Sequence, residues 1–533
     1  MTDLQQNVNV GEKYPDTIDV VIVGAGFAGL FMLHRLRQQG LLARIFEAGG
    51  GIGGAWYWNS YPGARCDVES MEYSYSFCDE LQQEWKWSER YASQSEILRY
   101  LNHVADRFDL HRDIQLESRV TAAIFDENLA HWKIQTDCGD RQSAKFLIMA
   151  TGCLSVPKVP DIKGLDSFKG NYYHTGQWPH EDVNFAGRRV AIIGTGSSGI
   201  QLIPVIAEQA AHVFQWWKSN YNEHRRMAQE TYFGVLPDHI KDCSTLNVTP
   251  EEELQEHEKP QHIEGFDFAS SLDEILVDKE ANHRASEFVR DHIRSIVKDP
   301  ATAELLLPYD HPIATKRLCV DNHYFETYNR DNVTLVDLRN DCIDEIVPTG
   351  LQIKDKIYQV DYIVFATGFD AITGALLNID ICGRSGKMLR EKWVHGPRTY
   401  LGIMIADFPN LFTICGPGSP SVLSNMVASI EQHVEWVAEC LAYLRTHHFD
   451  TIEADVEAEN MWVIHVKEVA DRTLFAVANS WYTGSNIPGK PRTVMPYVGG
   501  FHVYRQKCKQ AVLNNYETFR FKTHSLAPST IIE

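Results

Sequence analysis

The chain has 533 residues, of which 44% are hydrophobic and 23% are charged, an ordinary globular balance in a chain too long for one domain of usual size. The formal net charge of −21 repels nucleic-acid backbones and anionic lipid surfaces, so neither nucleic-acid nor membrane binding is expected. The polar start lacks the pattern of a signal peptide, and no apolar run approaches the ~20 residues that span a bilayer. Eleven cysteines without a CxxC pair disfavour structural zinc or a disulfide framework. We therefore expect a cytoplasmic protein with reduced thiols; its oligomeric state stays unknown.

The first predicted strand leads into a glycine motif, Gly24-x-Gly26-x-x-Gly29, and a segment of helical character follows. Glycine at these positions permits a tight turn, close approach to a pyrophosphate and close packing of the helix on the strand. Glu47 ends the next strand, 18 residues after Gly29, where a carboxylate accepts the ribose hydroxyls of a dinucleotide. The full combination predicts a dinucleotide site.

A second motif of the same form spans 194–199, and its next strand ends in Trp216, Trp217 and Lys218 without an acidic residue. A carboxylate there would bind the ribose diol of NAD and repel the 2′-phosphate of NADP. Its absence, with Lys218 adjacent, favours NADP. The two tryptophans are equally well interpreted as ordinary core or surface aromatics.

A third β-branched run ends at Gly368 and echoes the run over 146–152. Alternating strands and helices predict parallel, doubly wound sheets. From about 220 to 311 the pattern changes; apolar residues recur at helical spacing over 281–297, and Pro300 follows as a stop. The predicted fold class is α/β, with two Rossmann-like doubly wound dinucleotide-binding domains and a mostly helical insertion.

Two dinucleotide motifs in one chain suggest electron transfer between two bound dinucleotides. Disulfide reductases have this layout but need a redox cysteine pair, and Cys66 and Cys78 are too far apart for the usual short spacing. More specific is the segment 168–179, in which Phe168, Gly170, His174 and Trp178-Pro179 match the pattern FxGxxxHxxxWP at every fixed position. It resembles the fingerprint of type I Baeyer–Villiger monooxygenases.

The segment 53–67 matches a second signature of that family, and the resemblance covers nearly the whole chain. Related flavin monooxygenases and N-hydroxylases lack the Trp-Pro ending. Within the family the chain is most similar to the phenylacetone monooxygenase branch, through 61–67, 416–420, 429–436 and 480–484.

The resemblance implies an enzyme that binds FAD, takes hydride from NADPH and uses O2 to convert a small hydrophobic ketone to an ester or lactone through a flavin peroxide. A peroxide anion needs a fixed cation in a water-poor pocket, and arginine suits this because it stays protonated. Arg317 matches the family position for this cation, and Asp67 would hold it in place. Without the resemblance, Lys316 and Arg317 read as a surface pair. Lys316 matches a contact to the 2′-phosphate, and Trp481 matches a mobile-loop residue that covers the nicotinamide.

The implied catalytic residues are thus Arg317 and Asp67. The motifs and the resemblance together predict cofactor contacts at Gly24, Gly26, Gly29, Glu47, Gly54, Trp56, Asp67, Tyr73, Val120 and Met426 for FAD, and at Thr195, Gly196, Ser197, Ser198, Gly199, Lys218, Lys316, Arg317 and Trp481 for NADPH. No metal is expected. Turn residues 421–423, together with Met426, are candidates for the substrate lining.

The implied division of the chain begins with 1–151, the first part of an FAD-binding domain, and 152–219, the first part of an NADP-binding domain. A helical insertion over 220–318 follows. Residues 319–370 complete the NADP-binding domain, and 371–533 complete the FAD-binding domain, with a mobile loop near 481–492.

Two other functions stay open. A flavin-dependent N- or S-hydroxylase would use the same oxidant on an amine or sulfide; Trp178-Pro179 and Arg317 argue against this as the main activity. A decayed dinucleotide-binding protein is the other alternative, since Trp216 stands where relatives carry an arginine that grips the 2′-phosphate. Retention of Asp67, Lys316 and Arg317 argues against decay.

Overall fold

The computed structural model describes residues 14–207, 273–309, 311–317, 319–320, 323–338 and 342–523. Trp216, Trp217 and Lys218 lie outside these described residues. Within the described ranges, none of the helices has the length and apolar character needed to cross a bilayer.

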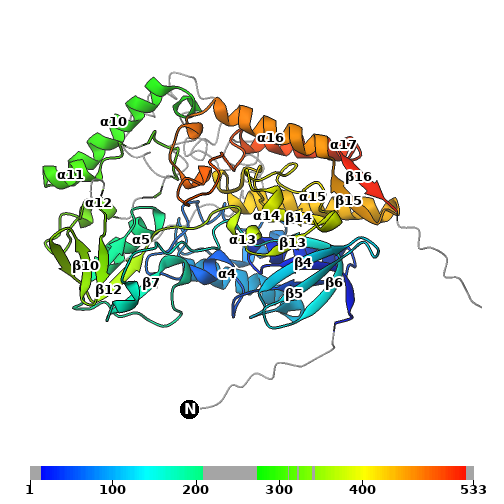
Figure 1. Cartoon of the computed structure of the whole chain (residues 1–533), viewed down its shortest axis with the longest axis horizontal. Helices are drawn as coiled ribbons and strands as arrows, with labels where there is room; N and C mark the ends of the chain where they lie inside the picture. Colours follow the sequence, from blue (N-terminus) through cyan, green and yellow to red (C-terminus); the bar gives the residue numbers. More distant parts are fainter. Residues whose placement is uncertain are drawn as a thin grey trace, which may run out of the picture.

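The larger of two parallel-rich sheets has eight strands in the order β13-β4-β5-β6-β1-β2-β3, with β14 paired to β6 (Figure 1). Pairs among β1, β2, β3, β6 and β14 are parallel, and β13 pairs parallel with β4. The bounds are β1 (Thr17–Val23), β2 (Ala43–Phe46), β3 (Ile114–Gln115), β4 (Val120–Asp126), β5 (His131–Thr136), β6 (Arg141–Met149), β13 (Asp380–Cys382) and β14 (Leu411–Thr413).

This sheet departs from the expected all-parallel winding, because β5 runs antiparallel to both β4 and β6. Side chains of β5 alternate between buried and exposed, and one-sided burial is typical of antiparallel strands. By contrast, β1 is buried on both faces over most of its length. Helix α1 (Phe27–Gln38) joins β1 to β2 and packs against α15 (Met426–Thr446).

The second sheet is parallel and has β12 (Tyr362–Phe365) between β7 (Asn171–His174) and β8 (Val190–Ile193). Helix α5 (Ser197–Ala207) follows β8. The β-branched run that ends at Gly368 therefore supplies the central strand of this sheet. Beside it lies an antiparallel sheet of β9 (Glu345–Val347), β10 (Gly350–Ile353) and β11 (Lys356–Gln359).

Helices α10 (Lys279–Ile296) and α11 (Pro300–Leu306) lie above the second sheet in Figure 1. The side chain of Asp278 caps α10 by accepting the Ala281 N–H at 2.7 Å. Pro300 does more than end the preceding helix: it occupies the first turn of α11, where its missing N–H is not needed. The described part of the predicted insertion is mostly helical, and its last residues, 307–309 and 311–317, are loop.

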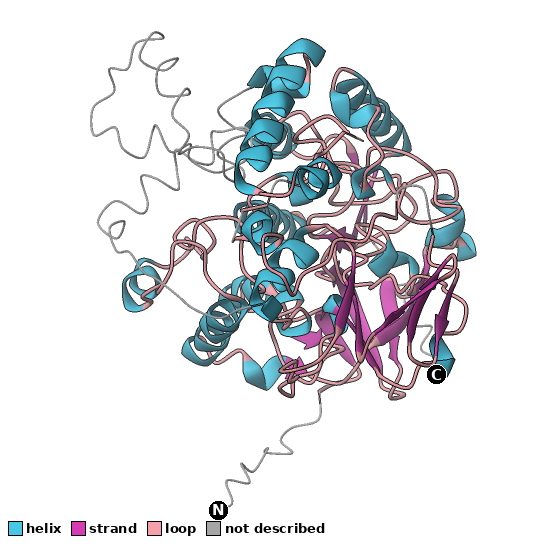
Figure 2. Cartoon of the chain, turned by 90° about the vertical axis from the view of Figure 1, so that its left-hand side faces the viewer, coloured by secondary structure: helices cyan, strands magenta, loops and turns pink. Residues whose placement is uncertain are grey.

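In Figure 1 the long helices of the C-terminal part of the chain cover the larger sheet, and Figure 2, coloured by secondary structure, shows helices above the strands. The remaining elements are α2 (Ala55–Trp58), α3 (Asp79–Glu84), α4 (Gln94–Arg107), α12 (Tyr324–Thr327), α13 (Gly374–Leu377), α14 (Leu389–Lys392), α16 (Val456–Asp471), α17 (Phe501–Leu513), β15 (Thr451–Ala454) and β16 (Phe519–Lys522). One core cluster joins α1 and α15 to the sheet, and a second lies around Trp132 and Phe408.

Candidate active site

The first glycine motif forms the turn between β1 and α1. Gly24 has φ +103°, and a Cβ added to Gly29 would lie 1.9 Å from the Gly24 carbonyl oxygen, so the fold itself demands both glycines. A Cβ on Gly26 would instead meet only backbone atoms of Gly53 and Gly54 at van der Waals distance, the nearest being the Gly54 Cα at 3.4 Å. Nothing in the described protein requires Gly26 to be glycine. The residues thus form a backbone-lined cradle that fits a pyrophosphate.

Glu47 lies at the edge of this cradle and is only 4% exposed. Its Oε2 accepts the Ala25 N–H and its Oε1 accepts the Gly49 N–H, both at 2.7 Å. Burial raises the pKa of Glu47, although these backbone donors act against the rise. The carboxylate therefore fixes the glycine turn, and its remaining lone pairs are of the kind that accept ribose hydroxyls.

The other residues predicted around FAD fall on several elements. Trp56 donates from Nε1 to the Tyr73 hydroxyl at 3.3 Å. Val120 begins β4, two residues after Ser118, whose N–H donates to the Glu47 carbonyl at 2.8 Å. Met426 opens α15, which the buried Asn425 side chain caps. Val120 is thus brought near Glu47 by the backbone hydrogen bond of Ser118, and Trp56 contacts Tyr73.

The second glycine motif repeats this geometry between β8 and α5. A Cβ on Gly194 would lie 2.2 Å from the Ala366 carbonyl oxygen, and one on Gly199 would lie 2.4 Å from the Gly194 oxygen. A Cβ on Gly196, however, would meet nothing within 4 Å. As in the first motif, only the middle glycine is left without a role in packing, which fits a second pyrophosphate at this turn.

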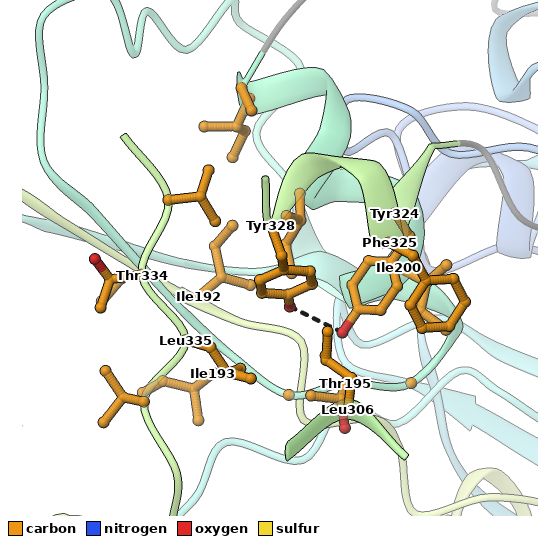
Figure 3. Close-up of a pocket in the computed structure, with 18 of the residues that line it drawn as sticks. Ile192, Ile193, Thr195, Ile200, Leu306, Tyr324, Phe325, Tyr328, Thr334 and Leu335 are labelled. Carbon is orange, nitrogen blue, oxygen red and sulfur yellow. Dashed lines mark hydrogen bonds between the residues drawn. The ribbon is translucent and has the colours of Figure 1, made fainter. Parts of the chain in front are cut away.

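A cavity of about 2570 Å³ opens beside this turn. Thr195, Gly196 and Ser197 line it together with the predicted residues Lys316, Arg317 and Trp481. Figure 3 shows part of the cavity wall around Thr195, to which Ile192, Ile193 and Ile200 contribute along with Tyr324 and Tyr328, whose hydroxyls are hydrogen-bonded at 2.9 Å. Ser198 hydrogen-bonds Tyr61, and Gly199 follows in the first turn of α5. Lys218 lies outside the described residues.

Arg317 makes a two-pronged ion pair with Asp67. Its Nε donates to Oδ2 and its Nη2 to Oδ1, each at 2.6 Å, and Nη1 donates to the Val422 carbonyl at 2.6 Å. The two side chains are 17% and 14% exposed. Burial acts to lower the pKa of Arg317, but the charge and hydrogen bonds of Asp67 outweigh it and raise that pKa above its ordinary value. The guanidinium is therefore a permanent cation held in a fixed orientation.

The turn expected to line the substrate site is buried. Ser421, Val422 and Leu423 are at most 7% exposed and form a short 3₁₀ turn before α15. This turn contributes to the site through the Val422 carbonyl, which accepts a hydrogen bond from Arg317. The amino-acid sequence does not reveal this contact, because any residue can supply a backbone carbonyl acceptor.

A second contact that sequence analysis missed joins α5 to the signature loop before Asp67. Gln201 of α5 accepts the Tyr61 hydroxyl at 2.8 Å and donates to the Arg65 carbonyl at 3.1 Å. A Cβ on Gly63 would lie 2.3 Å from the Gln201 carbonyl oxygen, which explains that glycine. Helix α5 therefore packs directly against the loop that carries Asp67.

The loop that begins at Trp481 is anchored on the segment after β12. Lys490 Nζ donates to Asp370 Oδ1 at 2.5 Å, and Asn486 Nδ2 donates to the Phe369 carbonyl at 2.8 Å. Gly484 and Gly489 have φ of +73° and +76°. His174 of the fingerprint is buried at the end of β7, in register with Phe365 of β12.

The part of the chain that the structure describes contains neither a disulfide nor a cluster of metal ligands beside these residues. Its ten cysteines are all free thiols, Cys66 and Cys78 among them, so a redox disulfide has no support there. A search of the same residues finds no cluster of His, Cys, Asp and Glu suited to a metal ion.

The chain is similar in sequence and structure to several known proteins. A family model described as pyridine nucleotide-disulphide oxidoreductase matches residues 21–261. The acetone monooxygenase (methyl acetate-forming) of Gordonia sp. (strain TY-5) is 39% identical over 94% of this chain and 99% of its own length. A Baeyer-Villiger monooxygenase of Pseudooceanicola batsensis is 39% identical over 91% of this chain and 93% of its own.

A relative with different chemistry also matches: the phenazine N-monooxygenase of Lysobacter antibioticus is 39% identical over 94% of this chain and 96% of its own length. Among solved structures, an oxidized steroid monooxygenase bound to NADP is 48% identical, with a TM-score of 0.87 over 95% of this chain and 100% of that one. With near-complete coverage of these relatives and both signatures present, the chain belongs to the type I Baeyer–Villiger monooxygenase family.

Proposed function

We propose that this protein is an FAD-containing, NADPH-dependent Baeyer–Villiger monooxygenase that uses O2 to insert one oxygen atom beside a ketone carbonyl, giving an ester or lactone. The observation that carries this proposal is the Arg317 cation, held by Asp67 and the Val422 carbonyl in the cavity that Gly196 and Trp481 also line. A fixed, protonated guanidinium in a partly dry site is suited to stabilise an oxygen anion.

We assign FAD to the turn at Gly26, which Glu47 fixes, and NADPH to the turn at Gly196, whose cavity Lys316 lines; a Cβ at either middle glycine would not clash with the fold. Glu47 would bind the FAD ribose, and Trp481 would cover the nicotinamide. When bound, the reduced flavin supplies the activated oxygen. The protein's part is to hold the two dinucleotides close together, exclude water, and present Arg317 to the negative charge that develops on oxygen during attack on the ketone.

Asp67 acts through Arg317 in this scheme. Its two oxygens accept the Nε–H and one Nη2–H of Arg317, and the Val422 carbonyl accepts from Nη1, so the guanidinium is fixed in orientation beside the cavity. NADPH is proposed over NADH because Lys316 lines the cavity and supplies the positive charge that a 2′-phosphate attracts. Lys218 would add to this charge.

We further propose the domain division set out above, with 1–151 and 371–533 forming the FAD-binding domain. Two contacts support it: β13 and β14 from the later segment pair with β4 and β6 of the earlier one. Pairing of β12 with β7 and β8 similarly supports one NADP-binding domain built from 152–219 and 319–370, with 220–318 inserted. Both domains would be Rossmann-like.

The substrate is proposed to be a small hydrophobic ketone. The segments 61–67, 416–420, 429–436 and 480–484 support a position beside the phenylacetone monooxygenases, and the similarity to a steroid monooxygenase makes a steroid ketone a second choice. A second function is hydroxylation at nitrogen or sulfur, which the 39% identity to a phenazine N-monooxygenase favours.

The deciding experiment offers the purified protein NADPH and ¹⁸O2 with phenylacetone, cyclohexanone, a steroid ketone, an aryl sulfide and a phenazine. One ¹⁸O atom in an ester or lactone, formed in step with NADPH oxidation, is the expected result. Oxide formed only on the sulfide or phenazine would support the second function instead. A colourless protein that oxidises no coenzyme would point to a decayed relative.

A further inference from the structure

Asn282 on α10 makes an unusual contact with the chain that leads to Arg317. Its Nδ2 donates to the Ile313 carbonyl at 3.0 Å, and its Oδ1 accepts the Ile313 N–H at 3.1 Å. The side-chain amide thus pairs with both backbone groups of one residue, as a neighbouring β-strand would. Nδ2 also donates to the Ile275 carbonyl at 2.7 Å, and Oδ1 accepts the Ser286 hydroxyl at 3.4 Å. At 4% exposed, Asn282 is buried and fully bonded.

The segment that Asn282 holds is strained. Ala314 has φ +65°, a left-handed conformation that is unfavourable for a residue other than glycine. Such a conformation persists only where its surroundings enforce it. Asn282 fixes the residue before Ala314, and on the other side the buried Thr315 donates from its hydroxyl to the Pro312 carbonyl at 2.6 Å. Lys316 and Arg317 follow directly.

We propose that Asn282 is a positioning residue for Lys316 and Arg317. It acts on them indirectly, by holding the bend of the backbone at Ala314. This inference rests on the proposed function for its catalytic consequence. A carboxylate at this position lacks the donor, an alkyl side chain lacks both groups, and a hydroxyl has its donor and acceptor on one oxygen that cannot face both backbone groups of Ile313. Small displacements matter here, since an error of about 1 Å in a catalytic group can lower the rate about 100-fold.

The informative variant is Asn282→Asp, which keeps the size of the side chain but loses both N–H donors and turns negative charge toward two carbonyl oxygens. Ser286→Ala is the matched control. It is one turn along the same helix and removes only the 3.4 Å bond to Asn282 Oδ1, leaving the pairing with Ile313 intact. If Asn282→Asp yields no folded holoenzyme, Asn282→Ser replaces it, because a hydroxyl is too short to reach both Ile313 groups.

Two measurements on flavin-loaded enzyme test the proposal. The first is ester formed and hydrogen peroxide released per NADPH oxidised. In Asn282→Asp the ester rate should fall roughly 10- to 100-fold, with peroxide per NADPH rising severalfold and a raised KM for NADPH, while Ser286→Ala matches the wild type. The second is hydrogen–deuterium exchange in peptides spanning 311–317, which should quicken in Asn282→Asp alone.

Wild-type coupling in Asn282→Asp, or unchanged exchange over 311–317, would overturn the proposal. Equal uncoupling in Ser286→Ala would also overturn it, because the effect would then belong to the general packing of α10. A wild-type enzyme that oxygenates no ketone would defeat the proposed function, not this inference. In that case exchange over 311–317 and NADP⁺ affinity, measured by titration, still decide whether Asn282 holds the segment.

Discussion

Replacing Gly26 with alanine should weaken FAD binding without unfolding the protein. The added Cβ would lie 3.4 Å from the Gly54 Cα, an ordinary van der Waals contact, and the φ of −84° suits alanine. The stability of the apoprotein should therefore change by no more than about 1 kcal/mol, since alanine also restricts the unfolded chain. A pyrophosphate that approaches the turn would meet the new methyl group. Loss of one charge-assisted contact costs roughly 1.5–3 kcal/mol, or about 10- to 150-fold in affinity.

The assay is the ratio of flavin to protein absorbance after gel filtration, followed by titration of apoprotein with FAD and a thermal melt of the apo form. Gly29→Ala is the control, because its Cβ would lie 1.9 Å from the Gly24 carbonyl oxygen and should disrupt the fold itself. Full flavin occupancy in Gly26→Ala would show that this turn does not hold FAD. If Gly26→Ala melted as early as Gly29→Ala, our separation of a packing glycine from a binding glycine would be wrong.

Three further outcomes are expected. Arg317→Ala should still oxidise NADPH but release hydrogen peroxide, with ester formation about 100- to 1000-fold slower; Arg317→Lys should recover little, because an ammonium cannot bind both Asp67 oxygens and the Val422 carbonyl as a planar fork does, and near-normal ester formation in Arg317→Ala would remove the centre of the mechanism. Lys316→Ala should raise the apparent KM for NADPH far more than that for NADH in steady-state assays, and equal effects would count against a phosphate contact. Burial lowers the pKa of His433 to about 3, whereas a histidine in the unfolded chain has a pKa of about 6.5. Below about pH 6.5 the unfolded chain therefore binds a proton that the folded protein does not. Through this residue the free energy of unfolding should fall by about 2 kcal/mol from neutral pH to about pH 5. A His433→Gln variant should show a smaller loss of Tm over the same range, and an identical pH slope would contradict this.

The parts of the site that sequence analysis reached are those encoded locally. Gly24, Gly26 and Gly29 are readable because a βα turn needs glycine at fixed spacing, whatever lies elsewhere in the chain. Arg317 was different. With Lys316 it looks like part of a surface pair, and only the family resemblance identified it as the candidate catalytic cation. Its contact with Asp67 joins residues 250 positions apart. Long-range pairing of this kind has no local pattern.

Strand order shows the same division between local and distant information. The alternation in His131–Thr136 was present in the sequence and indicates an antiparallel strand, so β5 was predictable. The run Tyr362–Phe365 reads as a buried strand, but its position between β7 and β8 depends on which edges are left unpaired by other segments. Asn282 acts through the backbone of Ile313, so its amino-acid type alone does not reveal what it holds.

The central position of β12 has a consequence for how the protein is made. Strands β7 and β8 do not pair with each other in the described structure; each pairs with β12. Because 168 residues separate Ile193 from Tyr362, a ribosome adding about 5–20 residues per second needs roughly 10–30 s to supply the missing strand. Throughout that interval the nascent chain exposes strand edges that favour aggregation. Expression at lower temperature or with added chaperones should therefore raise the yield of folded protein more than stronger promoters do.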